Sequence, residues 1–320
     1  MHARRAAADV ALLLGLVALL AACATPPAEH GAQLDLRLQP AVGETYHLEM
    51  LADQVITLTV QGEAIRIPQT IGFGFTMTVT ETDAQGSWIA TRYDWARVKQ
   101  EALTGTFDYD SRNPPEVIPP AALGFDALIG KGFSAKVTPD GRVVEVTGAD
   151  EMIAGMMRDL SIADEGLRAQ LERDLRDQYG DESLRKTMEG FVVRYPAEPI
   201  EVGDSWTAQM KVGGFMPYIL DTTYTLESTE GDRATIALTS AISANPDAPA
   251  SDMDVAGATM RYEVTGTQQG TMTVDLRTGW SADAELSQSV TGTMIATTAS
   301  GETSVPVAIE ATTRLTMTKE

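Results

Sequence analysis

A strict alternation of side-chain size between residues 71 and 79 constrains the fold of this chain most strongly. Five large apolar residues alternate there with glycine or threonine: Ile71, Phe73, Phe75, Met77 and Val79. Successive side chains of a β-strand point to opposite faces, so this pattern places all the large side chains on one face. The stretch therefore predicts a strand with one apolar and one polar face.

Turn sequences and further alternation extend this prediction to most of the chain. Asp83-Ala84-Gln85-Gly86 separates the first strand from a second one at 88–98, and Pro139-Asp140-Gly141-Arg142 separates two short apolar segments. The alternation returns after Gly203, in residues 206–212 and 272–286. Alternating strands joined by tight turns predict a mainly β (α+β) protein with antiparallel pairing.

The period of the sequence changes between about 149 and 191. Leu167, Leu171 and Leu175 are four residues apart and are flanked by charged residues, which is typical of an amphipathic helix. Asp181 is suited to cap a further helix. We therefore expect an N-terminal β region at 34–148, a helical connector at 149–192 and a C-terminal β region at 193–320.

The two β regions show a weak internal repeat. Gly43-Glu44-Thr45-Tyr46 opens the first region and Gly203-Asp204-Ser205-Trp206 opens the second, and a threonine-rich hairpin follows each opening. The repeat predicts two similar antiparallel curved sheets, or half-barrels, joined by the short helical segment. Coincidence between generic β-hairpins is the alternative.

The N-terminal segment has the features of an export signal. Arg4 and Arg5 precede an apolar run from Ala11 to Leu20, which is half the roughly 20 residues that a membrane-spanning helix needs. The run ends in Leu20-Ala21-Ala22-Cys23, which resembles the lipobox of bacterial lipoproteins. The segment is therefore predicted to be removed.

The lipobox resemblance implies that residues 1–22 are a signal peptide and that residues 23–33 form a lipidated tether. It also implies diacylglycerol on the Cys23 thiol and an acyl group on the freed amine, which together suffice for lasting membrane attachment. Ala24 stands where an aspartate would favour the inner membrane, so we expect an outer-membrane location facing the periplasm. No other cofactor is expected.

The order of motifs in the folded part resembles an uncharacterised family of secreted bacterial lipoproteins. Three motifs carry this resemblance: GDSW (203–206), TYTL (223–226) and GTQQGTMTVDLRTG (266–279). It covers most of residues 40–295. The resemblance implies the architecture and export of the chain, and it implies no activity.

The charge balance and the scarcity of histidine and cysteine restrict the function. The chain has 45 acidic and 24 basic residues, which disfavours binding to nucleic acid or to anionic lipid through a basic face. One cysteine and three histidines cannot supply a zinc site within the fold. The acidic pairs Asp108/Asp110 and Asp252/Asp254 do not continue as EF-hand loops, so no metal is expected.

Two serines invite an enzymatic interpretation. Ser205 lies in a Gly-Asp-Ser sequence like that of GDS-type esterases, but His47 is the only histidine within the fold and none follows it. Ser183 and Lys186 match S-x-x-K, but the S-x-N and K-T-G elements that accompany this motif are missing. A hydrolase that works without histidine remains the third functional hypothesis.

An apolar binding surface is the leading functional hypothesis. Methionine suits irregular apolar ligands, and a helical flap over a curved sheet could hold an acyl chain as envelope lipid carriers do. The candidate ligand surface consists of helix and sheet residues: Met152, Met156, Met157, Met188, Phe73, Phe75 and Met77. The same residues could simply be the core.

The sequence thus predicts a non-catalytic, lipid-anchored envelope protein that binds a lipid or another hydrophobic ligand. The second hypothesis, a structural or protein-interaction module of the envelope, has an envelope protein as its partner. The sequence does not predict the oligomeric state.

Overall fold

The structure is a computed structural model, and it describes residues 33–102, 105–160, 162, 164–212, 216–246, 259–298 and 301–320. Within it, Leu34–Glu320 forms one compact unit. The predicted signal peptide, the lipobox and almost all of the tether lie outside the described residues, as does the Asp252/Asp254 pair.

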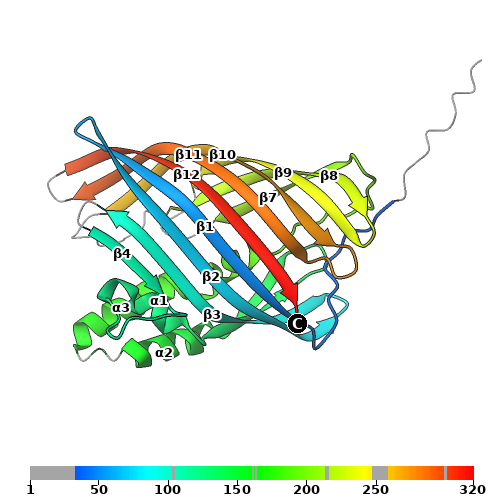
Figure 1. Cartoon of the computed structure of the whole chain (residues 1–320), viewed down its shortest axis with the longest axis horizontal. Helices are drawn as coiled ribbons and strands as arrows, with labels where there is room; N and C mark the ends of the chain where they lie inside the picture. The colour runs from blue at the N-terminus through cyan, green and yellow to red at the C-terminus, as the bar shows by residue number, and fades with distance from the viewer. Residues whose placement is uncertain are drawn as a thin grey trace, which may run out of the picture. The chain divides into compact units, whose positions relative to one another are not determined.

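Twelve antiparallel strands make up most of this unit (Figure 1). Their bounds are β1 (Thr45–Val60), β2 (Glu63–Asp83), β3 (Gly86–Ala102), β4 (Gly105–Asp110), β5 (Gly132–Val137), β6 (Val143–Thr147), β7 (Ser205–Val212), β8 (Tyr218–Glu230), β9 (Arg233–Ala244), β10 (Thr259–Asp275), β11 (Ser281–Thr298) and β12 (Gly301–Lys319). The helices are a short 3₁₀ turn at Pro120–Ala122, α1 (Leu123–Leu128), α2 (Ala149–Leu160), α3 (Glu165–Tyr179) and α4 (Asp181–Glu189). None of the described helices combines the length and the apolar character needed to cross a bilayer.

All the strands belong to one sheet, with the order β6-β5-β3-β2-β1-β12-β11-β10-β9-β8-β7 and with β4 paired to β3. The prediction of an antiparallel β protein is confirmed, but the prediction of two separate sheets is corrected. The first and last strands join the two β regions, in a register that runs from Tyr46↔Lys319 to Leu58↔Val307. Their apolar positions coincide, for example Leu48 with Met317, so the pairing buries both rows on one face and leaves neither strand as a free edge.

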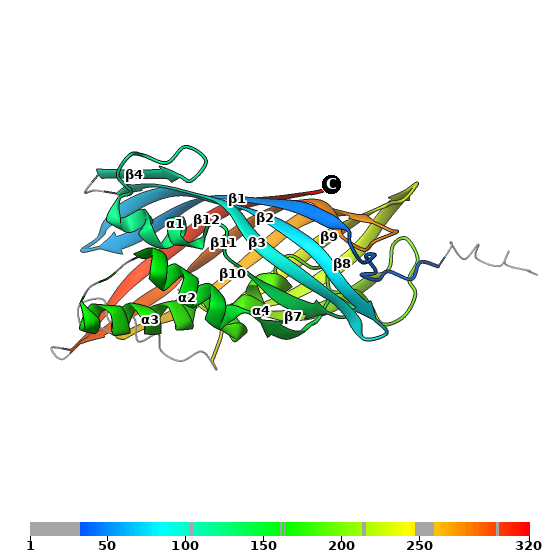
Figure 2. The same cartoon turned by 90° about the horizontal axis from the view of Figure 1, so that it is seen from below.

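The alternation predicted from the sequence gives the sheet two different faces. Leu48 on β1 pairs with Phe75 on β2, and both side chains are buried on the face that also carries the helices. We call this the inner face. The adjacent pair, His47 and Thr76, lies on the opposite, outer face. Figure 2 shows α1 to α4 on one side of the sheet, and Figure 1 shows α1 to α3 there.

Helix α4 shows how strongly the sheet curves. It packs against β6 and β5 and also against β7, although β6 and β7 are the two ends of the strand order. In the described strands β6 and β7 do not pair with each other, so the helix fills the space between two sheet edges. Leu184 and Met188 on α4 have no exposed surface and belong to the main core.

Two glycines permit close strand packing in the middle of the sheet. A Cβ at Gly270 on β10 would lie 2.1 Å from the carbonyl oxygen of Glu285, and a Cβ at Gly292 on β11 would lie 2.0 Å from that of Glu263. A side chain of any size would force the strands apart. Glycines at such positions allow a sheet to bend sharply.

The openings of the two β regions adopt the same local geometry. Gly43 and Gly203 both have positive φ, at 87° and 99°. In each opening the glycine N–H donates to a strand carbonyl, Val79 in the first and Leu226 in the second. The acidic residue that follows each glycine accepts a hydrogen bond from a backbone N–H three residues before it. The duplication of the whole β regions stays a prediction.

Candidate binding surface

The inner face of the sheet is almost free of charge. The pairing register assigns each strand residue to the inner or the outer face. Among the described pairs, the charged side chains on the inner face are those of Glu63 and Lys319, and each of these residues lies at a strand end. Tyr262 lies on this face, and burial raises its pKa to about 12, so its hydroxyl stays neutral. A surface of this kind can bind apolar or uncharged groups without leaving a charged side chain buried and unpaired.

The helix-covered end of the inner face is a packed core. It contains the residues that the sequence singled out as a ligand surface, and burial reaches 92% or more for six of them: Met152, Met156, Met157, Met188, Phe75 and Met77. Phe73 is partly buried, with its ring 6.0 Å from that of Tyr93 and 6.3 Å from that of Phe125. The structure thus brings the predicted residues together, in the packing expected of a core between helices and sheet. Their role as a ligand surface stays a prediction.

A second apolar cluster occupies the other end of the inner face, where β7 to β12 and β1 contribute. Six of its residues are buried: Leu220, Ile242, Tyr262, Val264, Val290 and Val307. Nine further apolar residues surround them and keep part of their surface exposed: Ile56, Leu58, Met210, Val212, Met216, Tyr218, Met260, Met294 and Ile309. We call these fifteen residues the distal cluster. Sequence reasoning missed it, although the alternation around Met210 was a usable signal.

A row in which seven of nine side chains are amides or hydroxyls crosses the inner face between the two apolar clusters. The registers align one position from each strand, from β3 to β7: Gln100, Gln69, Gln54, Ala311, Gln288, Gln268, Ser240, Thr222 and Ala208. We call this the amide row. Gln54 Nε2 donates to Gln69 Oε1 at 2.5 Å, and the hydroxyls of Thr222 and Ser240 are 2.8 Å apart.

A hydrogen bond across the concave side shows that the distal part of the sheet is strongly curved. Gln288 Nε2 on β11 donates to the hydroxyl of Tyr218 on β8 at 3.2 Å. Two strands separate β11 from β8, and three strand spacings of about 4.8 Å would place them roughly 14 Å apart along the sheet. Side chains of this length reach each other only because the sheet folds over.

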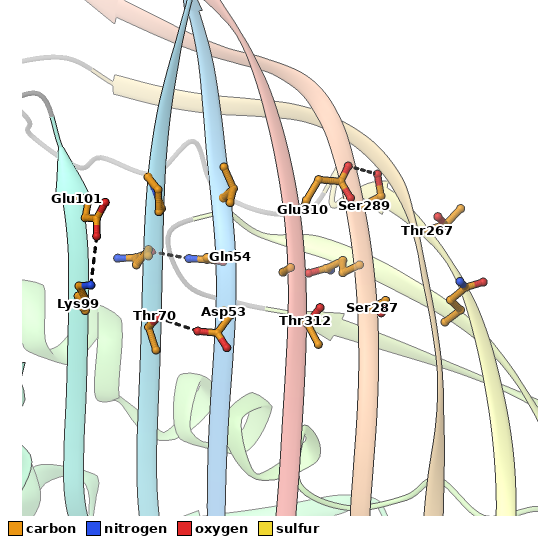
Figure 3. Close-up of a pocket in the computed structure, with 16 residues that line it drawn as sticks. Asp53, Gln54, Thr70, Lys99, Glu101, Thr267, Ser287, Ser289, Glu310 and Thr312 are labelled. Atoms are coloured by element: carbon orange, nitrogen blue, oxygen red, sulfur yellow. Dashed lines mark hydrogen bonds and ion pairs between the residues drawn. The ribbon is translucent and has the colours of Figure 1, made fainter.

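The outer face carries a shallow polar groove of about 640 Å³ (Figure 3). It lies over β1, β2, β3, β10, β11 and β12, and its polar side chains bond to one another. Thr70 Oγ1 donates to Asp53 Oδ1 at 2.7 Å, and Ser289 Oγ donates to Glu310 Oε1 at 2.7 Å. Lys99 pairs with Glu101 at 3.2 Å. Hydroxyl, amide and carboxylate groups lining this groove show that the outer face is built for contact with water or polar groups.

The residues considered for catalysis or metal binding have other partners. Ser205 Oγ lies 2.8 Å from Thr225 Oγ1, and Ser183 Oγ donates to the carbonyl oxygen of Asp177 at 2.8 Å. His47 Nδ1 lies 3.2 Å from Thr76 Oγ1. Among the described residues, no three His, Cys, Asp or Glu side chains gather as a metal site requires.

Comparison with known proteins identifies a family. The profile of a family of unknown function, DUF6263, matches residues 84–281, and no curated protein sequence matches the chain significantly. Two solved structures share 7% identity with it. The outer membrane protein OprG from Pseudomonas aeruginosa aligns over 88% of this chain and 98% of its own, with a TM-score of 0.25. An outer membrane channel from Pseudomonas putida F1 aligns over 91% of this chain and 99% of its own, with a TM-score of 0.28. Scores this low carry no argument about fold or function.

Proposed function

This chain belongs to the family of unknown function DUF6263, and we propose from its geometry that it is a non-catalytic envelope protein that binds a hydrophobic ligand on its inner face. One observation carries the proposal: the distal cluster presents partly exposed apolar side chains on a concave, nearly uncharged surface. Four of its nine partly exposed residues are methionines, whose flexible side chains adapt to irregular apolar ligands.

The free energy available at the distal cluster is enough for such a ligand. Burial of one methylene group contributes about 0.8 kcal/mol, so eight buried methylenes contribute roughly 6 kcal/mol. The loss of ligand freedom offsets a part of this gain. The proposed ligand is therefore an alkyl or acyl chain of at least this length.

A binding titration with matched variants tests the proposal. The mature chain with Cys23→Ser, exported behind a cleavable leader, is titrated with a fluorescent apolar probe and analysed by native mass spectrometry and lipid extraction. Met294 lies on the inner face in the distal cluster, and Thr293 lies next to it on the outer face. We expect Met294→Asp to weaken probe binding by about tenfold or more, and Thr293→Asp to leave it unchanged. Absence of probe binding to the parent chain, or equal effects of the two variants, would overturn the proposal.

We also propose that the chain is held at the membrane through lipid on Cys23 and that residues 23–33 act as the tether. The lipobox-like sequence Leu20-Ala21-Ala22-Cys23 supports this proposal. Labelled palmitate is expected to enter the full chain and to be lost in Cys23→Ser. Equal labelling of the two chains would show that the anchor is elsewhere or absent.

The outer groove favours a second candidate function, a protein-interaction module of the envelope. Its hydroxyl and carboxylate groups suit a polar partner surface rather than a lipid. A photo-crosslinking residue at Ser289 in the groove is compared with one at Met294 in the distal cluster. A stoichiometric protein adduct from position 289, with lipid-free protein from native purification, would favour this second function.

A further inference from the structure

The amide row places polar side chains between apolar positions of the inner face. Gln54 lies between Ala52 and Ile56 on the inward side of β1, and Gln288 lies between Leu286 and Val290 on that of β11. Apolar residues therefore stand on both sides of the row on these two strands. All the glutamines of the row are partly buried, and Ser240 and Thr222 are fully buried.

Where an amide at these positions is shielded from water, it has a free-energy cost unless it is hydrogen-bonded. A buried amide that lacks a partner costs roughly 1 to 3 kcal/mol, and an apolar side chain would fit the alternation equally well. Each glutamine amide offers two donors and two acceptor lone pairs. The bond between Gln54 and Gln69 uses one donor and one acceptor of these two side chains. The row therefore retains capacity both to donate and to accept.

The electrostatic environment selects against a charged partner at the amide row. The inward positions of the neighbouring strands carry no acidic or basic side chain between the strand ends. Burial raises the pKa of Tyr218, so the hydroxyl that bonds Gln288 stays protonated. A charged group placed here would lose its hydration and gain no counter-ion. The whole chain also has a formal net charge of −21, which repels anions.

We propose that the amide row binds the uncharged head group of an amphiphile whose alkyl chain lies on the distal cluster. The head group is of the ester, amide or hydroxyl type, because these groups both donate and accept hydrogen bonds or accept them from amide N–H groups. The ligand enters head first and stops at the row, because the closely packed main core lies beyond it. This inference rests on the proposed function and specifies the class of its ligand.

Three probes that share a dodecyl-length chain test the inference: a monoacylglycerol, the fatty acid anion and an alkyltrimethylammonium cation. Each is titrated below its micellar concentration into the mature Cys23→Ser chain. We expect the monoacylglycerol to bind about tenfold more tightly than either charged probe. This difference corresponds to one polar contact that the charged probes leave unmade.

Variants assign the selectivity to the row. Gln54→Leu and Gln268→Leu are expected to reduce the preference for the monoacylglycerol to less than about threefold, while Thr267→Val, on the outer side of β10, leaves it unchanged. Equal affinities of the three probes for the parent chain would overturn the role of the amide row and leave the proposed function standing. If no probe binds, both are overturned. The comparison among probes needs only the parent chain, so poor folding of a variant does not affect this outcome.

Discussion

Truncation of Leu184 tests whether helix α4 holds the two ends of the sheet together. Leu184 has no exposed surface and lies in the main core, on the helix that packs against β5, β6 and β7. Leu184→Ala would remove contacts at the place where the sheet does not pair with itself. We therefore expect a large loss of stability from this single change.

The size of the loss follows from the burial. The substitution removes three carbon atoms, and at about 0.8 kcal/mol per carbon the lost transfer free energy is roughly 2.4 kcal/mol. The cavity that remains raises the expected total to about 3 to 5 kcal/mol. Native domains are stable by only about 5 to 15 kcal/mol, so this is a substantial fraction of the whole.

Urea denaturation followed by far-UV circular dichroism and tryptophan fluorescence measures this effect. Leu167→Ala on α3 is the matched control, because Leu167 is 55% exposed and the change in helix propensity is the same. The control should lie within about 0.5 kcal/mol of the parent chain. If Leu184→Ala falls within about 0.5 kcal/mol of Leu167→Ala, the role of α4 between the sheet edges is refuted.

Two further predictions concern buried polar contacts. The hydroxyl of Tyr195 donates a hydrogen bond to the carbonyl oxygen of Gly279 at 2.6 Å within the core. Tyr195→Phe should therefore lower the unfolding free energy by about 1 to 2 kcal/mol in the same urea assay. An unchanged midpoint of urea denaturation would contradict this. Burial pushes the pKa of Glu44 upward, but hydrogen bonds from Lys319, Tyr46 and the Ala41 N–H outweigh it and hold the pKa below its ordinary value of 4.5. Because the folded pKa is depressed, the stabilisation from Glu44 is complete above about pH 4.5 and is lost as the pH falls through the folded pKa. Glu44→Gln should therefore flatten the acid limb of the stability curve, and an acid limb parallel to that of the parent chain would be evidence against it.

Local patterns predicted local structure well in this chain. The alternation at 71–79 lies in β2, the turn at Asp83–Gly86 joins β2 to β3, and the change of period at 149 marks the start of α2. These features depend on residues close in sequence, where the strand or helix period is decisive. The uncharacterised family was also anticipated, at the level of a family of unknown function.

Long-range pairing was beyond the reach of these patterns. Two strands with alternating apolar residues can pair with many partners, so nothing local specifies that β1 joins β12 across the whole folded chain. The amide row escaped notice for the same reason. Gln54 and Gln268 are 214 positions apart, and they share a row only through the registers of the strands between them. The methionine-rich helices were recognised as apolar, but burial against the sheet was not distinguishable from exposure to a ligand.

The pairing of β1 with β12 has a consequence for biogenesis. The strand at the centre of the sheet is made after every other strand, so the emerging polypeptide presents an unmatched β1 edge until translation reaches residue 319. Contacts between segments so far apart in sequence form slowly, and partly folded intermediates with exposed strand edges are prone to aggregate. A nascent chain of this topology cannot complete its sheet before β12 has been synthesised, and a chaperone that covers the edge of β1 would prevent that edge from pairing with other chains.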